Sequence, residues 1–168
     1  MIHLTERKSQ SIASYFNSLK VVPVSISYEF DPNDLLKAKE LYSSQSNSVY
    51  AKEKDEDLRS IANGITGFKG NVNINLSEPM RFEDEDDYKE ISNKITHSIV
   101  SMYELHATNF AACNLLDITI SDQKKYTLQE IKQAEKNLES RLEALEKGVR
   151  SKLLEQYANP VIRKLEQT

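Results

Sequence analysis

Residues 21–32 decide the fold of this 168-residue chain, and they read Val21-Val22-Pro23-Val24-Ser25-Ile26-Ser27-Tyr28-Glu29-Phe30-Asp31-Pro32. Their first eight positions are rich in β-branched residues and predict a strand over 21–28. Side chains alternate along a strand, so one face carries Val22, Val24, Ile26 and Tyr28, and the other carries Val21, Pro23, Ser25 and Ser27. Pro23 cannot donate to a ladder, which puts the strand's start at an edge or outside the paired region. Asp31 and Pro32 then predict a helix start.

A second strand is predicted over residues 71–76, where asparagine alternates with an apolar residue. We expect Val72, Ile74 and Leu76 to face inward and the three asparagines to face outward. Two strands alone cannot cover both faces of a sheet, and a strand as apolar as 21–28 is typical of a sheet buried on both faces. We therefore expect part of the domain that completes this sheet to lie outside the sequence.

Helical periodicity accounts for most of the remaining chain. Helices are predicted over 5–19, 35–42 and 55–66, the last ending with Gly67 in the left-handed conformation. A long helix follows the acidic run at 83–87, and a short one covers 109–116. A capping box from Thr127 to Glu130 opens an amphipathic helix. Its apolar stripe is Leu128, Ile131, Leu138, Leu142, Leu145 and Val149. Asn159 and Pro160 are expected to break the chain before a last turn over 161–165.

Together these elements predict an α/β fold class with two strands and a predominantly helical tail. We divide the chain into an αβ portion, residues 1–82, and a helical tail packed on it, residues 83–168.

The charge balance argues against nucleic-acid binding. Lys and Arg number 22 against 26 Asp and Glu, a net charge of −4, so no basic field exists to attract phosphates. The single cysteine, Cys113, excludes an internal disulfide and a cysteine-based zinc site, and its apolar neighbours predict a buried thiol. We expect a cytoplasmic location.

Few residues suggest chemistry. His3, His97 and His106 lack partners at catalytic or metal-ligand spacing, and His106 is predicted to lie in the core or at its boundary. The acidic run at 83–87 is interpreted as a solvated helix start rather than a metal site. Glu29 follows a strand and precedes a helix start, a position that often lines a cleft. We assign no catalytic residue, no metal and no cofactor from the sequence.

Several segments, in order, resemble parts of the bacterial 1-acylglycerol-3-phosphate acyltransferases and related glycerol acyltransferases. Residues 21–32 resemble the V-P-V strand of that family, and 34–41 the helix that follows it. Residues 68–80 resemble its later strand, G-x-V-x-V-x-x-G-E-P, with Ser77 at the position of the usual glycine. Residues 108–112 and 157–161 resemble pieces of its helical tail. The resemblance implies that the chain is the C-terminal portion of an acyltransferase-type αβ domain.

The family's defining motifs are absent. In H-x-x-x-x-D the histidine takes the proton from the acceptor hydroxyl and the aspartate orients the imidazole. Here the fifth residue after each histidine is Lys8, Met102 or Ala111, and the acceptor-binding F-P-E-G element is missing too. The resemblance therefore implies a fragment of a phospholipid-biosynthesis acyltransferase that is inactive alone.

For the complete parent, the resemblance implies acyl-CoA or acyl carrier protein as donor and a glycerol-phosphate-type acceptor. It also implies peripheral attachment to the inner face of the cytoplasmic membrane through the missing half. Glu29 would then line the acceptor cleft and hold an Arg or Lys of that half. We further expect self-association of the fragment. The alternatives are a non-catalytic helical interaction module and an independent enzyme that uses Glu29 or His97.

Overall fold

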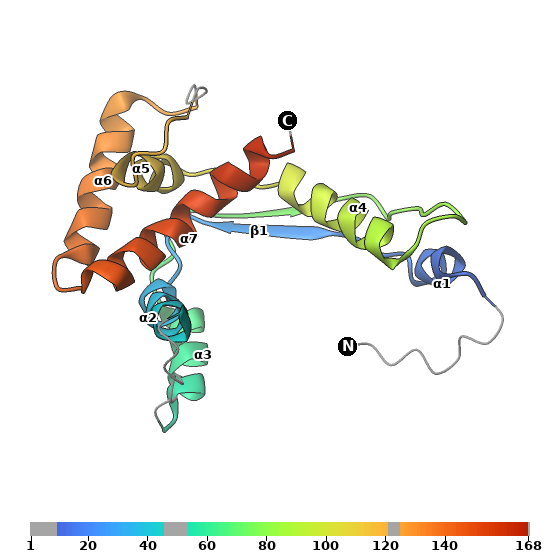
Figure 1. Cartoon of the computed structure of the whole chain (residues 1–168), viewed down its shortest axis with the longest axis horizontal. Helices are drawn as coiled ribbons and strands as arrows, with labels where there is room; N and C mark the ends of the chain where they lie inside the picture. The colour runs from blue at the N-terminus through green and yellow to red at the C-terminus, as the bar shows by residue number, and fades with distance from the viewer. Residues whose placement is uncertain (1–9, 46–53, 121–124, 168) are drawn as a thin grey trace.

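The computed structural model describes residues 10–45, 54–120 and 125–167 (Figure 1). These residues form seven helices and two strands, so the predicted helix-rich mixture of helix and sheet is confirmed in that coarse form. In chain order the elements are α1 (Ile12–Leu19), β1 (Val24–Tyr28), α2 (Asp34–Gln45), α3 (Glu56–Thr66), β2 (Val72–Leu76), α4 (Tyr88–Ser101), α5 (Ala107–Leu115), α6 (Leu128–Leu142) and α7 (Lys147–Leu165).

The two predicted strands pair with each other in antiparallel register. Val24 lies opposite Leu76, Ile26 opposite Ile74, and Tyr28 opposite Val72. Pro23 stands just outside β1, as expected from its missing N–H, and its carbonyl accepts a hydrogen bond from the Ser77 N–H at 3.1 Å. The described residues add no third strand to this sheet.

The predicted orientation of β2 was wrong. Val72, Ile74 and Leu76 are 43%, 58% and 67% exposed, and the apolar residues of β1 lie on the same uncovered face. The asparagines at 73 and 75 are half-buried instead. The Nδ2 of Asn75 donates to the Met102 carbonyl at 2.9 Å. The linker between α4 and α5 therefore covers the polar face of the sheet. The alternation is as predicted, but the covered face is the opposite one.

The larger core lies among α2, α5, α6 and α7. It joins Phe30 and Ala38 from the first half of the chain to the buried residues of the last three helices, which include Phe110, Leu138 and Leu153. Figure 1 shows α7 crossing the molecule between α2 and the α5–α6 pair. Residues from both predicted parts, 1–82 and 83–168, thus meet in this core, and the division between them stays a prediction.

The predicted stripe over 128–149 divides between two helices. The capping box is confirmed: Thr127 Oγ1 accepts from the Glu130 N–H, and Glu130 Oε2 accepts from the Thr127 N–H at 2.8 Å. However, α6 ends at Leu142, and Val149 belongs to α7. Leu128 is 76% exposed rather than part of the core.

A smaller core joins α1 to α4 at the opposite end of the molecule (Figure 1). It buries Ala13, Phe82 and Ile91, and the ring of Phe16 contacts that of Phe82 edge-on with centroids 5.9 Å apart. Asn17 holds the two segments together, because its Oδ1 accepts from the Phe82 N–H and its Nδ2 donates to the Phe82 carbonyl, both at 2.9 Å.

Helix α7 continues through Pro160, against the predicted break. A proline inside a helix disturbs the carbonyls of the preceding turn, which then need other partners. Pro160 has no N–H to donate to the Gln156 carbonyl four residues earlier. The Nδ2 of buried Asn109 donates to the adjacent Tyr157 carbonyl at 2.8 Å, which fixes α7 to α5 at the turn before the proline.

Gly67 follows α3 as predicted, but its conformation was predicted wrongly. Its φ is −67° and its ψ 152°, which is extended rather than left-handed. A close approach explains the glycine instead. A Cβ at this position would lie 2.5 Å from both the Asn63 carbonyl oxygen and the Pro32 Cβ. Between α3 and β2, the glycine in the left-handed region is Gly70, with φ 61°.

Gly67→Ala should therefore loosen α3 from the Pro32 turn, because the new methyl group clashes with backbone. We expect a loss of roughly 1–3 kcal/mol in local stability, measured by amide hydrogen exchange along α3. Gly64→Ala is the matched control, since a Cβ there comes no closer than 3.4 Å to Asn33 and alanine favours the helix. Equal protection in the two variants would contradict the close-approach explanation.

Candidate functional site

The segment between β1 and α2, residues 29–33, forms a corner of the chain. Several polar side chains that the sequence analysis considered lie at or beside this corner. Asp31 was predicted to cap the helix, but it closes the turn before it: its Oδ1 accepts from the Asn33 N–H at 2.8 Å and its Oδ2 accepts from Lys37 Nζ. The helix itself begins at Asp34, two residues after Pro32. Asp34, the first residue of α2, is only 2% exposed.

Asp34 is the centre of a buried polar cluster drawn from three helices. Its Oδ2 accepts from Arg141 Nη2 of α6 at 2.6 Å and from the Tyr157 hydroxyl of α7 at 2.7 Å. Its Oδ1 accepts from the Leu35 N–H at 2.6 Å. A buried carboxylate needs such partners, because an unpaired charge in the interior is strongly unfavourable.

Tyr157 connects this cluster to the corner. Its hydroxyl donates to Asp34 and accepts from the Asp31 N–H at 3.1 Å. Burial, followed by the neighbouring Asp34 charge, raises the pKa of the Tyr157 hydroxyl far above its usual range. Tyr157 therefore stays a neutral hydrogen-bond donor, and Asp34 is engaged by its partners rather than free to act as a base.

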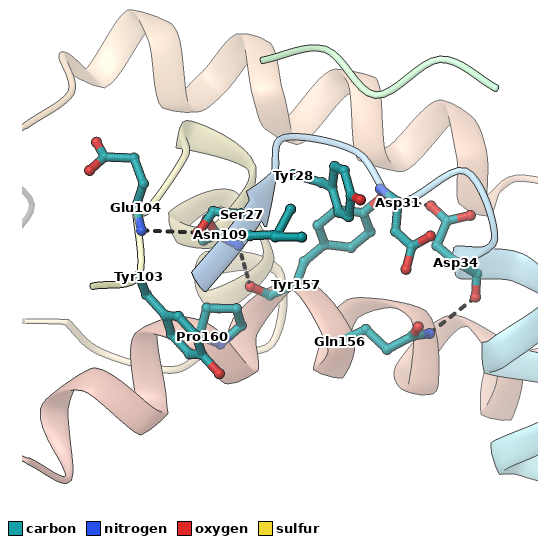
Figure 2. Close-up of a pocket in the computed structure, with 11 residues that line it drawn as sticks. Ser27, Tyr28, Asp31, Asp34, Tyr103, Glu104, Asn109, Gln156, Tyr157 and Pro160 are labelled. Carbon is teal, nitrogen blue, oxygen red and sulfur yellow. Dashed lines mark hydrogen bonds between the residues drawn. The ribbon is translucent and has the colours of Figure 1, made fainter. Parts of the chain in front are cut away.

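A cavity of about 210 Å³ opens beside this corner (Figure 2). Figure 2 shows its wall assembled from the end of β1 and the corner, from the linker that precedes α5, and from α7. The lining residues are Ile26, Ser27, Tyr28, Asp31, Asp34, Tyr103, Glu104, Asn109, Gln156, Tyr157 and Pro160. It is smaller than the roughly 300–1,000 Å³ typical of small-molecule pockets, so it suits one side chain or a short extended segment better than a cofactor.

Glu29, the predicted site residue, lies at the end of β1 but not in the wall of this cavity. Its Oε2 accepts from the Asn71 N–H at 2.9 Å and from Asn71 Nδ2 at 2.8 Å. A Cβ on Gly70 would lie 2.5 Å from the same oxygen. Among the described residues, the hydrogen-bond partner of the carboxylate is Asn71 and not an Arg or Lys. Its proposed role toward the missing half stays a prediction.

The histidines are not brought together. His97 is exposed on α4, and His106 is 4% exposed, which confirms its predicted place in the core. The His106 N–H donates to Asn109 Oδ1 at 2.7 Å, and its Nε2 lies 3.4 Å from the Ser27 carbonyl oxygen. His3 lies outside the described residues. These contacts indicate a structural histidine at the start of α5.

Cys113 and the acidic run also behave as structural features. Cys113 is buried, as predicted, and burial raises the pKa of its thiol to about 11, which disfavours the reactive thiolate. Asp87 caps α4 through the Glu90 N–H, and Asp86 pairs with Lys94, whose hydrogen bond lowers the pKa of Asp86. Across 10–45, 54–120 and 125–167, no group of three or more His, Cys, Asp or Glu side chains could hold a metal ion.

The Asp34 cluster could not be predicted from the sequence. Its members stand at positions 34, 141 and 157, each on a separate helix, and no spacing rule joins them. From the sequence alone, Asp34 is only a favourable charge at a helix start. One argument could have pointed to the cluster: if the start of this helix is buried, a carboxylate in its first turn needs a partner of opposite charge or a hydrogen-bond donor.

Comparison with known proteins finds no family model, no curated protein and no solved structure that matches this chain. In the described part of the chain, none of the helices has the length and apolar character needed to cross a membrane.

Tyr157→Phe should destabilise the fold by about 1–3 kcal/mol, because it removes a donor to buried Asp34 and leaves the Asp31 N–H without its acceptor. Urea unfolding followed by circular dichroism measures the loss. Tyr103→Phe is the matched control from the opposite side of the same cavity. A Tyr157→Phe variant as stable as this control would show that Arg141 and the Leu35 N–H are sufficient partners for Asp34.

Glu29→Ala should destabilise the turn at Gly70 and Asn71 by about 1 kcal/mol, because two donors of Asn71 lose their acceptor. Glu29→Gln keeps a carbonyl oxygen at this position and should be close to neutral. Unfolding midpoints of the two variants test this difference. If both variants unfold at the same midpoint as the parent chain, the contact with Asn71 contributes nothing to stability.

Proposed function

We propose that this chain is the C-terminal portion of a glycerolipid acyltransferase and serves as a scaffold for a catalytic half that it lacks. In the complete enzyme, an acyl group would pass from the thioester of acyl-CoA or acyl carrier protein to a hydroxyl of a glycerol-phosphate-type acceptor. The thiol would leave, and the histidine of H-x-x-x-x-D in the upstream half would take the hydroxyl proton. The same half would attach the enzyme to the inner face of the cytoplasmic membrane.

The order and placement of the resembling segments support this proposal. Residues 21–32 form β1 and the corner, and 68–80 contain β2 and the turns on either side of it. The two strands are hydrogen-bonded neighbours, so the segments that carry the resemblance form one piece of structure. Residues 108–112 and 157–161 also meet, through the Asn109 bond to the Tyr157 carbonyl.

The observation that carries the proposal is the incomplete sheet. Glu29 and Asn71 are bonded through their backbones, as are Pro23 and Ser77, so the odd-numbered residues of β1 point their backbone groups at β2. The N–H and C=O groups of Val24, Ile26 and Tyr28 then point to the other edge, where the described residues supply no backbone partner. A strand with one such edge is a template for a further strand.

The chain's own side chains favour a scaffold over an independent enzyme. Asp34 is engaged by Arg141 and Tyr157, Cys113 is buried, and His97 stands alone on an exposed helix face. None of these combines a free base, a nucleophile and a site for substrate. A non-catalytic interaction module is the second candidate function, and the uncovered apolar face of the sheet favours it.

A chimaera decides between these functions. The chimaera is a bacterial 1-acylglycerol-3-phosphate acyltransferase whose C-terminal portion is replaced by this chain. Its upstream half keeps the H-x-x-x-x-D and F-P-E-G motifs of the bacterial enzyme. We expect acyl transfer from acyl-CoA or acyl carrier protein to lysophosphatidate by the chimaera, and none by this chain alone. A general base contributes roughly 10²–10⁴-fold in rate, so the same chimaera with its motif histidine changed to alanine is the control. A folded but inactive chimaera would favour the interaction module.

Glu29→Gln in the active chimaera then tests the site prediction. Because glutamine preserves the contact with Asn71, a loss of activity with unchanged folding would indicate that the negative charge acts toward the upstream half. Unchanged kinetics for donor and acceptor would make Glu29 a turn residue only.

A further inference from the structure

The cavity beside the corner also lies at the outer edge of β1 (Figure 2). The side chains of Ile26 and Tyr28 are on the uncovered face of the sheet, whereas Ser27 faces the linker before α5. A cavity that contacts all three residues must therefore lie at a margin of the strand. One margin is taken by β2, and none of residues 72–76 lines the cavity. The cavity is consequently beside the outer backbone groups of β1.

These outer groups favour one kind of ligand. The N–H and C=O groups of Val24, Ile26 and Tyr28 point away from β2, and the described residues supply them with no backbone partner. Donors and acceptors that recur at every second residue match the backbone of another extended chain. When a peptide adds a strand to a sheet edge, main-chain hydrogen bonds give affinity and pockets for its side chains give specificity. This edge of β1 has both.

The residues that line the cavity are rich in hydrogen-bond acceptors. Three of them are carboxylates, and none is Lys, Arg or His. Glu104 binds Lys125 through Oε1, and no described residue donates to its Oε2. Gln156 uses its Nε2 to donate to the Asp34 carbonyl, which leaves its Oε1 as an acceptor to which no described residue donates. Its main-chain carbonyl is a further acceptor, because Pro160 has no N–H to offer it.

We propose that the outer edge of β1 and this cavity, together called the edge site, bind an extended segment of another polypeptide whose Lys or Arg side chain enters the cavity. Residues opposite each other on neighbouring strands share a face. The ligand residue opposite Ser27 therefore points to the covered side of the sheet, where the linker and α7 line the cavity. Its two neighbours in the segment point to the uncovered face, beside Ile26 and Tyr28. The ligand thus carries one cation between two apolar residues.

Charge and size agree with this ligand. A cationic side chain makes charge-assisted hydrogen bonds with carboxylate and carbonyl oxygens, and the net charge of −4 attracts a basic segment. The cavity of about 210 Å³ has room for one long side chain rather than a folded element. The inference goes beyond the proposed acyltransferase function, because it holds for the chain as it stands. In the complete enzyme proposed above, a strand of the upstream half would occupy the same edge.

A nine-residue peptide that alternates threonine with valine and has lysine at its centre tests the proposal with the intact chain. An NMR titration measures its affinity, and amide hydrogen exchange shows where it binds. We expect this peptide to bind roughly tenfold or more tightly than the same peptide with a central glutamate, which would place a negative charge among acceptors. We also expect protection of the Val24, Ile26 and Tyr28 amides, because these N–H groups gain partners from an added strand.

Ile26→Pro removes one outward N–H without removing a bond to β2, and proline is tolerated in an edge strand at such positions. This variant should bind the lysine peptide roughly tenfold or more weakly than the parent chain. Ile74→Pro is the matched control, because it makes the same change at the opposite residue of β2, and it should bind like the parent. Circular dichroism establishes that both variants are folded.

If either proline variant is unfolded, Glu104→Gln takes its place. This change leaves the backbone of β1 intact and should reduce the preference for lysine over glutamate in the peptide. The proposal is overturned if the lysine peptide does not bind, if it binds without protecting the three amides, or if the glutamate peptide binds as tightly. A folded Ile26→Pro variant that binds like the parent overturns it as well. These results leave the acyltransferase proposal to its own test, the chimaera.

Discussion

The buried carboxylate of Asp34 is the interaction on which the arrangement of the larger core depends. It stands at the first residue of α2, where the chain leaves β1, and takes hydrogen bonds from Arg141 on α6 and Tyr157 on α7. The start of α2 is thereby fixed to two helices that come more than a hundred residues later in the sequence. Because a buried charge that loses its partner costs about 3–5 kcal/mol, a large part of the stability of an ordinary domain, any rearrangement of these helices has to keep the contact. Phe30 reinforces it, with the Arg141 guanidinium 5.6 Å from the centre of its ring.

The same anchor determines which face of the sheet is covered. With the corner held against α7, the polar side of β1 lies toward the linker before α5. Two hydrogen bonds fix that linker in place. The Tyr126 hydroxyl donates to the Leu105 carbonyl at 3.0 Å, and Lys164 Nζ donates to the Tyr103 carbonyl at 2.6 Å. The apolar face of the sheet is left outside, with Val24, Ile26, Val72, Ile74 and Leu76 between 43% and 67% exposed. Burying an aliphatic side chain completely contributes about 1.5–3 kcal/mol, so these five side chains, about half in water, forgo roughly 1 kcal/mol each. Their sum is comparable to the whole stability of a small domain, and it is the strongest physical reason to expect a covering layer.

The sequence predicts where the helices and strands lie better than it predicts what packs against them. The strands followed from alternation, the starts of α4 and α6 from acidic or capping-box residues, and the burial of Cys113 from its apolar neighbours. Alternation states which residues share a face, but it cannot say which face is covered, since that depends on what packs against the sheet. The conformation of Gly67 was predicted wrongly for a related reason. The glycine is required by a distant group, the Pro32 turn, and no local rule contains that information.

The groups of the described residues differ in whether they have partners, and this difference bears on what each region can bind. At the corner, where a site was expected, the carboxylates of Glu29, Asp31 and Asp34 are all engaged by groups of the chain itself. Chemistry at this corner would require a free group, and none of the three offers one. Away from the corner, the described residues leave two larger sets of groups without partners: the outer backbone groups of β1 and the apolar side chains on the uncovered face of the β1–β2 sheet. Backbone groups and apolar surface recognise strands and packed layers rather than small substrates. In the described residues, these unpartnered groups therefore favour contact with a further strand or an apolar layer over the binding of a small substrate at the corner.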